Sequence, residues 1–121
     1  MNRLITASAI ALATAGAASA QVAEECRTVT FSDVGWTDIT TTTAAAKHVF
    51  EGLGYDVEVK VLSVPVTFAS LESDGIDVFL GNWMPSQTQA IQPYLDSGEI
   101  EQVAVNLEGT KYNLAVPSAT Y

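Results

Sequence analysis

The chain has 121 residues, one cysteine, one histidine and a formal net charge of −9 at pH 7. One cysteine and one histidine are too few for a usual zinc site, and no cofactor-binding motif is present, so we expect neither metal nor cofactor. The acidic balance argues against nucleic acid as a partner, because its binders carry basic patches, and it mildly favours cationic small molecules.

The first twenty residues have the features of an export signal. A short positive start is followed by an uncharged apolar run over 4–15 and by the small residues at 18–20 that a signal peptidase recognises. We expect cleavage after Ala20, which leaves a periplasmic protein that begins at Gln21. Without Arg3 the net charge becomes −10. A buried N-terminal helix is the alternative.

Apolar periodicity then predicts alternating strands and helices. Thr37 or Asp38 is expected to cap the first helix and Ser86 the third, while Gly54 and Gly98 end them. The alternation predicts an α/β fold with a mostly parallel sheet and helices on both faces. The expected strands are 27–31, 56–63, 76–80, 100–105 and 112–116, and the expected helices are 39–53, 65–72 and 87–95.

Two tryptophans occupy matching places in this pattern. Trp36 and Trp83 each follow a predicted strand and a nearby glycine, and each precedes a predicted helix. In α/β proteins ligands lie beyond the carboxyl ends of the strands, so the two indoles are candidate walls of an aromatic cage for a quaternary ammonium group. Either residue taken alone is more typical of a core tryptophan.

Other side chains have less specific signals. Tyr112 is a candidate third wall or an ordinary strand tyrosine, and Asp38 is a helix cap or a carboxylate beside the cage. Cys26 either forms a disulfide with a thiol outside this sequence or is a free thiol. His48 is best explained as a structural residue in a helix, and no catalytic constellation appears.

Three segments, 31–38, 61–66 and 77–85, resemble the substrate-binding proteins of quaternary-ammonium ABC importers, the glycine betaine and choline group, and most of all its periplasmic choline-binding members. The resemblance implies a lobe of the type II periplasmic-binding-protein kind, a monomer that closes two lobes on its ligand and docks on a membrane permease. Residues 21–121 would be the N-terminal part of that binding domain, a fragment without the second lobe and of marginal stability alone.

The resemblance also implies roles for single residues. Trp36, Trp83 and Tyr112 would be cage walls, and Asp38 would lie near the hydroxyl and charged head of the ligand. Cys26 would form a disulfide with a cysteine outside this chain. Choline is the favoured ligand, because the Asp38 carboxylate can accept a hydrogen bond from the choline hydroxyl and would repel the carboxylate of glycine betaine.

Three alternatives remain open at this point. The ligand could be glycine betaine, proline betaine or carnitine, or the chain could be the ligand-sensing module of a receptor. An enzyme on the same fold is the third possibility, but it would need a nucleophile and a base that this sequence does not display.

Overall fold

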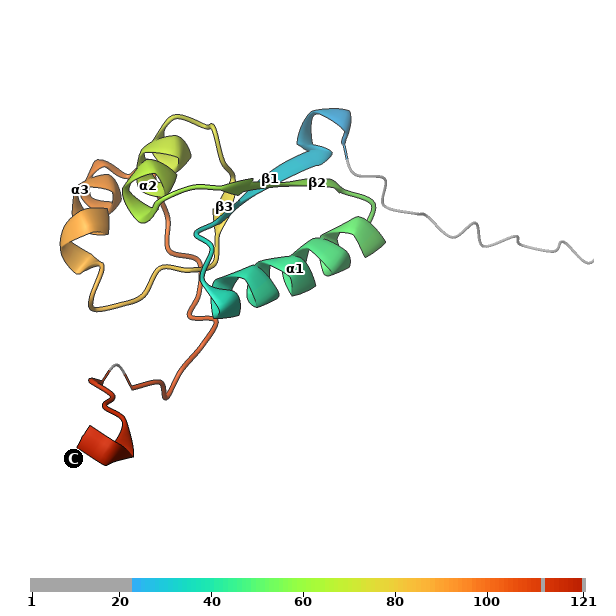
Figure 1. Ribbon diagram of the computed structural model, residues 1–121. Coiled ribbons are helices and arrows are strands. Elements are labelled where there is room, and N and C mark those ends of the chain that lie inside the picture. The colour runs from blue at the N-terminus through green and yellow to red at the C-terminus, as the bar shows by residue number, and fades with distance from the viewer. Residues whose placement is uncertain (1–22, 112, 121) are drawn as a thin grey trace, which may run out of the picture.

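The computed structural model describes residues 23–111 and 113–120. Strands and helices alternate as far as α3, and the chain beyond α3 leaves the body as an extended segment (Figure 1). In chain order the elements are η1 (Glu24–Cys26), β1 (Thr28–Asp33), α1 (Thr37–Gly52), β2 (Asp56–Val61), α2 (Val64–Glu72), β3 (Val78–Phe79), α3 (Thr88–Ser97) and η2 (Ser118–Thr120), where η denotes a 3-10 helix.

The three strands form one parallel sheet in the order β2-β1-β3. β1 pairs with β2 along its whole length, from Thr28 opposite Asp56 to Asp33 opposite Val61. The pairing with β3 is short, and it sets Ser32 opposite Phe79. The mostly parallel sheet is therefore confirmed, and the carboxyl ends of all three strands lie at one edge.

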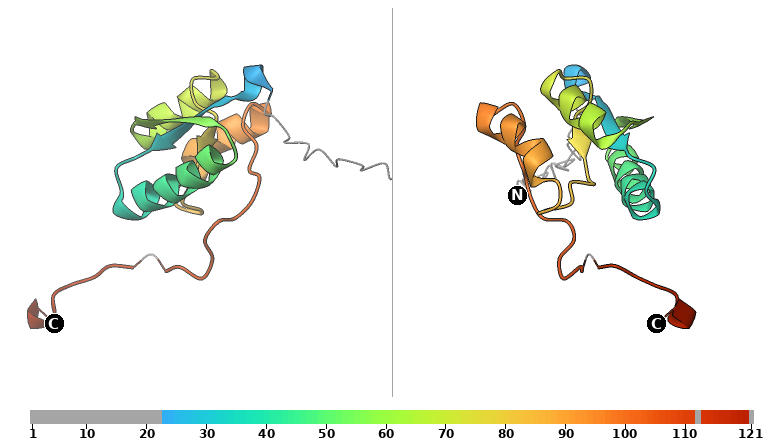
Figure 2. Two further views of the ribbon diagram at one scale, coloured as in Figure 1. Left: turned by 90° about the vertical axis from the view of Figure 1, so that its right-hand side faces the viewer. Right: turned by 60° about the vertical axis from the view of Figure 1, so that its left-hand side comes forward.

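Helices cover both faces of this sheet, as the alternation predicted. Phe31 meets the Phe50 ring of α1 edge-on with ring centres 5.4 Å apart, whereas the Ser32 hydroxyl hydrogen-bonds the Thr67 hydroxyl of α2 at 2.7 Å. Successive strand residues point to opposite faces, so α1 and α2 lie on opposite sides. Figure 2 shows α3 beside α2 and away from α1.

The core is small and largely aromatic and β-branched. Phe68 of α2 lies near its centre, with the rings of Phe79 and Tyr94 each 6.0 Å away. Because Tyr94 belongs to α3, this cluster holds α3 against α2 and β3. The buried apolar side chains are Phe31, Ile39, Phe68, Ile76 and Ile91.

The predicted helix starts need correction. Thr37 and Asp38 lie inside the first turn of α1, whose N-cap is Trp36 without a side-chain cap. The helix begins early because the Asp33 carboxylate bends the chain and accepts the Gly35 N–H. Asp38 still stabilises the helix there, since a carboxylate in the first turn opposes the helix dipole.

Ser86 is not the cap of α3 either. Its hydroxyl donates to the Trp83 carbonyl at 3.3 Å, and α3 starts at Thr88 after an N-cap Gln87. The predicted ends are confirmed: Gly98 is the C-cap of α3 at φ 79°, and Gly54 follows α1 at φ 96°. Both conformations are ones that glycine adopts easily.

The last two predicted strands are wrong within the described residues. Neither 100–105 nor 113–116 forms a strand, and residues 101–111 are exposed. A strand needs a neighbour for its backbone groups, and among the described residues the sheet consists of β1, β2 and β3, with neither segment paired to it. Residues 1–20, the expected export signal, lie outside the described part. None of the described helices has the length and apolar character needed to cross a membrane.

Candidate functional site: two tryptophans at the carboxyl edge of the sheet

Trp36 is positioned by a polar turn at the end of β1. The buried Asp33 carboxylate accepts the Gly35 N–H at 2.8 Å and the Thr40 hydroxyl at 2.9 Å. Gly35 has φ 76°, a conformation that favours glycine. These contacts turn the chain so that Trp36 stands at the start of α1 with 37% of its surface exposed.

Trp83 is positioned by packing and by its own turn. Gly81 is buried, and a Cβ there would lie 2.8 Å from the Phe79 ring and 3.1 Å from Ile39. The backbone of this loop therefore passes close to the core. Beyond it, the Trp83 carbonyl accepts the Gln87 N–H at 2.9 Å, which fixes the turn leading into α3.

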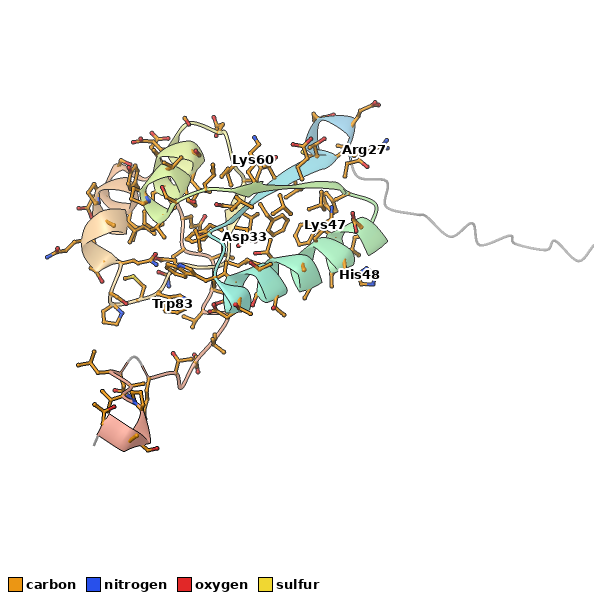
Figure 3. The ribbon with its side chains drawn as sticks, viewed as in Figure 1. Arg27, Asp33, Lys47, His48, Lys60 and Trp83 are labelled. Atoms are coloured by element: carbon orange, nitrogen blue, oxygen red, sulfur yellow. The ribbon has the colours of Figure 1, made fainter. Side chains whose placement is uncertain are left out.

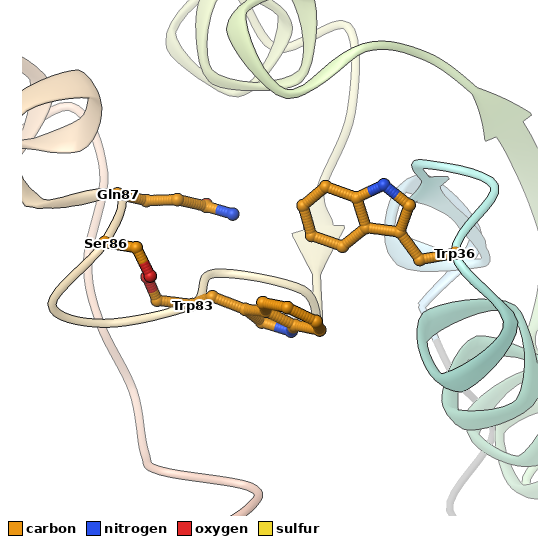
Figure 4. Close-up of a pocket in the computed structure, with 4 residues that line it drawn as sticks. All are labelled: Trp36, Trp83, Ser86 and Gln87. Atoms are coloured by element: carbon orange, nitrogen blue, oxygen red, sulfur yellow. The ribbon is translucent and has the colours of Figure 1, made fainter. Parts of the chain in front are cut away.

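The structure brings the two indoles together. Their ring centres are 4.8 Å apart and their planes are tilted by 50°. A pocket of about 410 Å³ opens beside them and is completed by Ser86 and Gln87, whose side chain extends toward Trp36 (Figure 4). Trp36 and Trp83 meet because β1 and β3 are adjacent in the sheet.

A second pocket, of about 390 Å³, shares Trp83 and Ser86 with the first. Asp38 and Thr42 of α1 line one part of it, and the segment after α3 lines another. Asp38 therefore shares this second pocket with Trp83, although it does not line the first pocket, the one that Trp36 lines. The remaining lining residues are Leu80, Asn82, Met84, Asn106, Leu107, Thr110 and Lys111.

The sequence reasoning did not identify Gln87, Asn106 or Lys111. Lys111 directly precedes Tyr112 in the sequence. The usable signal was its position next to that candidate wall, because neighbours of a ligand residue tend to approach the same site. Tyr112 itself lies outside the described residues.

Cys26 and His48 lie away from this edge. Cys26 is an exposed free thiol in η1, before the amino end of β1. In Figure 3, Trp83 lies toward the left, Asp33 near the middle, and His48 and Arg27 toward the right. Within the described residues, no three His, Cys, Asp or Glu side chains are grouped so that they could hold a metal ion.

Comparison with known proteins gives this edge its context. Residues 27–121 match a family model described as the substrate binding domain of ABC-type glycine betaine transport system. Among solved structures, a choline binding protein of an ABC transporter in complex with choline is 60% identical with a TM-score of 0.62, over 64% of this chain and 27% of that one. The unliganded semi-closed form is 61% identical with a TM-score of 0.58, over 62% and 26%.

Two curated proteins are also similar. An uncharacterized protein of Chromohalobacter salexigens, ORF1, is 52% identical over 99 residues, which are 82% of this chain and 64% of that protein. The glycine betaine/carnitine transport binding protein GbuC of Listeria monocytogenes is 27% identical over 84 residues, which are 69% of this chain and 28% of that protein. The chain thus spans less than two thirds of each relative.

The family match covers most of the chain. Proteins of this kind hold a solute for transport and are not enzymes, which fits a site built from indoles rather than from a nucleophile and a base. The chain belongs to the family of substrate-binding domains of ABC-type glycine betaine transport systems.

Proposed function

We propose that this protein captures choline for an ABC importer and that Trp36 and Trp83 are two walls of the binding site. The observation that carries the proposal is the pair of tilted indoles at the carboxyl edge of the sheet. A trimethylammonium group has no N–H to donate, so its recognition depends on burial and on the negative faces of aromatic rings. Two such faces at one edge provide this chemistry.

The geometry of the pair is compatible with one shared cation. The ring centres are 4.8 Å apart and the ring planes are tilted by 50°. If the two ring faces point toward one common position, that position lies about 6 Å from each ring centre, which is within cation–π range. The rings would then be adjacent walls of a cage. Tyr112, the expected third wall, remains part of the proposal.

Asp38 supplies the charge and the hydrogen-bond acceptor that choline needs. It lines the pocket that shares Trp83, at the first turn of α1. Its carboxylate attracts the cation and can accept the ligand hydroxyl, whereas it repels the carboxylate of a betaine. The choline-bound protein that is 60% identical supports the same ligand.

A zwitterionic ligand is the second candidate, and Lys111 is the observation that favours it. Lys111 lines the same pocket as Asp38, so its ammonium group could pair with the carboxylate of glycine betaine or carnitine. GbuC, a glycine betaine/carnitine binding protein, is a similar but more distant relative. Choline would therefore engage Asp38, whereas a zwitterionic ligand would engage Lys111.

The proposed location and protein partner follow from the family and from the signal-like first twenty residues. A binding protein of an importer meets its ligand outside the cytoplasmic membrane and delivers it to a permease. The signal-like residues 1–20 support export to the periplasm. We propose the membrane permease of the same importer as the protein partner.

Calorimetric titration of choline tests the proposal. Each indole face contributes on the order of 2 kcal/mol, so Trp36→Ala or Trp83→Ala should weaken choline binding roughly thirtyfold. Val103→Ala, at a side chain that is 88% exposed, serves as a control for truncation of an apolar residue. Absence of choline heat at millimolar concentration, or unchanged affinity in both tryptophan variants, would refute the proposal.

A paired charge variant identifies the ligand class. Asp38→Asn and Asp56→Asn change the net charge equally, but Asp56 lies at the amino end of β2, away from the site. Only Asp38→Asn should weaken choline binding, by roughly tenfold, which is the effect of a lost charge-assisted hydrogen bond. If Asp38→Asn instead tightens glycine betaine binding and leaves choline unaffected, the zwitterion is the ligand.

A further inference from the structure

The segment after α3 has no regular structure but approaches the site at one place. Residues 101–111 are exposed and contain no helix or strand. The Asn106 side-chain amide donates to the Leu80 carbonyl at 3.0 Å, across 26 positions of sequence. Leu80 lies between β3 and the Trp83 loop, so this bond joins the segment to the backbone that leads to Trp83.

The consequence of this bond is a pocket wall. From this segment, Asn106, Leu107, Thr110 and Lys111 all line the pocket that contains Asp38 and Trp83. Leu107 remains 63% exposed, so little apolar burial holds the wall in place. A well-formed hydrogen bond at its first residue therefore contributes much of its positional order.

We infer that Asn106 is a positioning residue for the ligand site. Its amide holds residues 106–111 against the Trp83 loop and so keeps this segment in place as a wall of the pocket that Asp38 also lines. This inference rests on the proposed function, because it assigns the wall to the same ligand site.

Asn106→Leu tests this role, because leucine keeps the size of asparagine but cannot donate. We expect choline affinity to fall roughly three- to tenfold, the equivalent of one ordinary hydrogen bond, and Asn106→Gln, which retains an amide, to restore part of it. Asn113→Ala is the control: Asn113 is exposed, lies in the same extended chain, and makes no hydrogen bond within the described residues.

A second measurement reads the wall without the ligand. In a Trp36→Phe background, acrylamide quenching of Trp83 fluorescence should increase when Asn106→Leu opens the pocket, and it should not change with Asn113→Ala. If the parent protein binds no choline, the proposed function fails, but the quenching measurement still tests whether Asn106 holds the pocket wall in place. Unchanged quenching with Asn106→Leu, or equal loss of affinity with Asn113→Ala, would overturn the inference.

Discussion

The two tryptophan loops have the same sequence pattern but are held by different forces. The loop before Trp36 depends on a carboxylate and a left-handed glycine: Asp33 accepts two hydrogen bonds, and a Cβ at Gly35 would meet nothing within 4 Å. The loop before Trp83 depends on space, because Gly81 passes against the Phe79 ring. One indole is therefore positioned by polar contacts, and the other by the core.

This difference explains how two equal motifs make one site. A side chain added at Gly35 would meet open space, whereas one added at Gly81 would have to displace the Phe79 and Ile39 side chains. Trp83 lines both pockets, whereas Trp36 lines one. The more closely packed loop thus carries the shared wall, and substitutions in the two loops should have distinguishable effects.

The largest expected effect is at Gly81. A Cβ there lies under 3.0 Å from two ring atoms of Phe79, so Gly81→Val should lower the free energy of unfolding by about 3 kcal/mol, at the upper end of overpacking effects. Urea denaturation measures it, and choline affinity should fall with it because Trp83 is displaced.

Gly35→Asn is the matched control for that comparison. Asparagine tolerates positive φ and the site is open, so this variant should lose less than about 1 kcal/mol. If Gly35→Asn proved as destabilising as Gly81→Val, the distinction between a loop held by conformation and one held by packing would be wrong.

A smaller effect is expected at Asp33. Asp33→Ala removes the acceptor for the Gly35 N–H and the Thr40 hydroxyl, and the loss should be about 1.5 kcal/mol in urea denaturation. Asp33→Asn keeps an oxygen acceptor and should lose less. Equal losses in the two variants would show that the negative charge, rather than the hydrogen bonds, stabilises the turn.

Much of the local structure was predictable because its causes are local. Alternating valines over Asp56–Val61, the glycine stops after α1 and α3, and proline in the first turn of α2 each act through neighbouring residues. The start of α1 was mispredicted because the Asp33 carboxylate accepts the Gly35 N–H and so forms the turn that Thr37 or Asp38 was expected to cap. A competing acceptor a few residues away has no distinct pattern in the sequence.

The candidate site was only half predictable. Trp36, Trp83 and Asp38 could be singled out by residue type and by their place after strands, but the roles of Gln87, Asn106 and Lys111 could not. Gln87 reaches the site through the local turn in which its backbone N–H donates to the Trp83 carbonyl, whereas Asn106 reaches it through a contact across a long separation, to Leu80. Such contacts depend on the path of a segment that has no periodicity of its own.

By itself, the sequence determined the alternation of strands and helices, the apolar faces and the presence of two indoles at strand exits, since backbone preference and hydrophobic period act over a few residues. Only the tertiary structure decided that the indoles meet. The sheet order β2-β1-β3 makes β1 and β3 neighbours, and strand order follows from how the helices pack on the two faces rather than from any local pattern. The same packing sets Gly81 against the Phe79 ring, a close approach that the sequence indicated only as a turn.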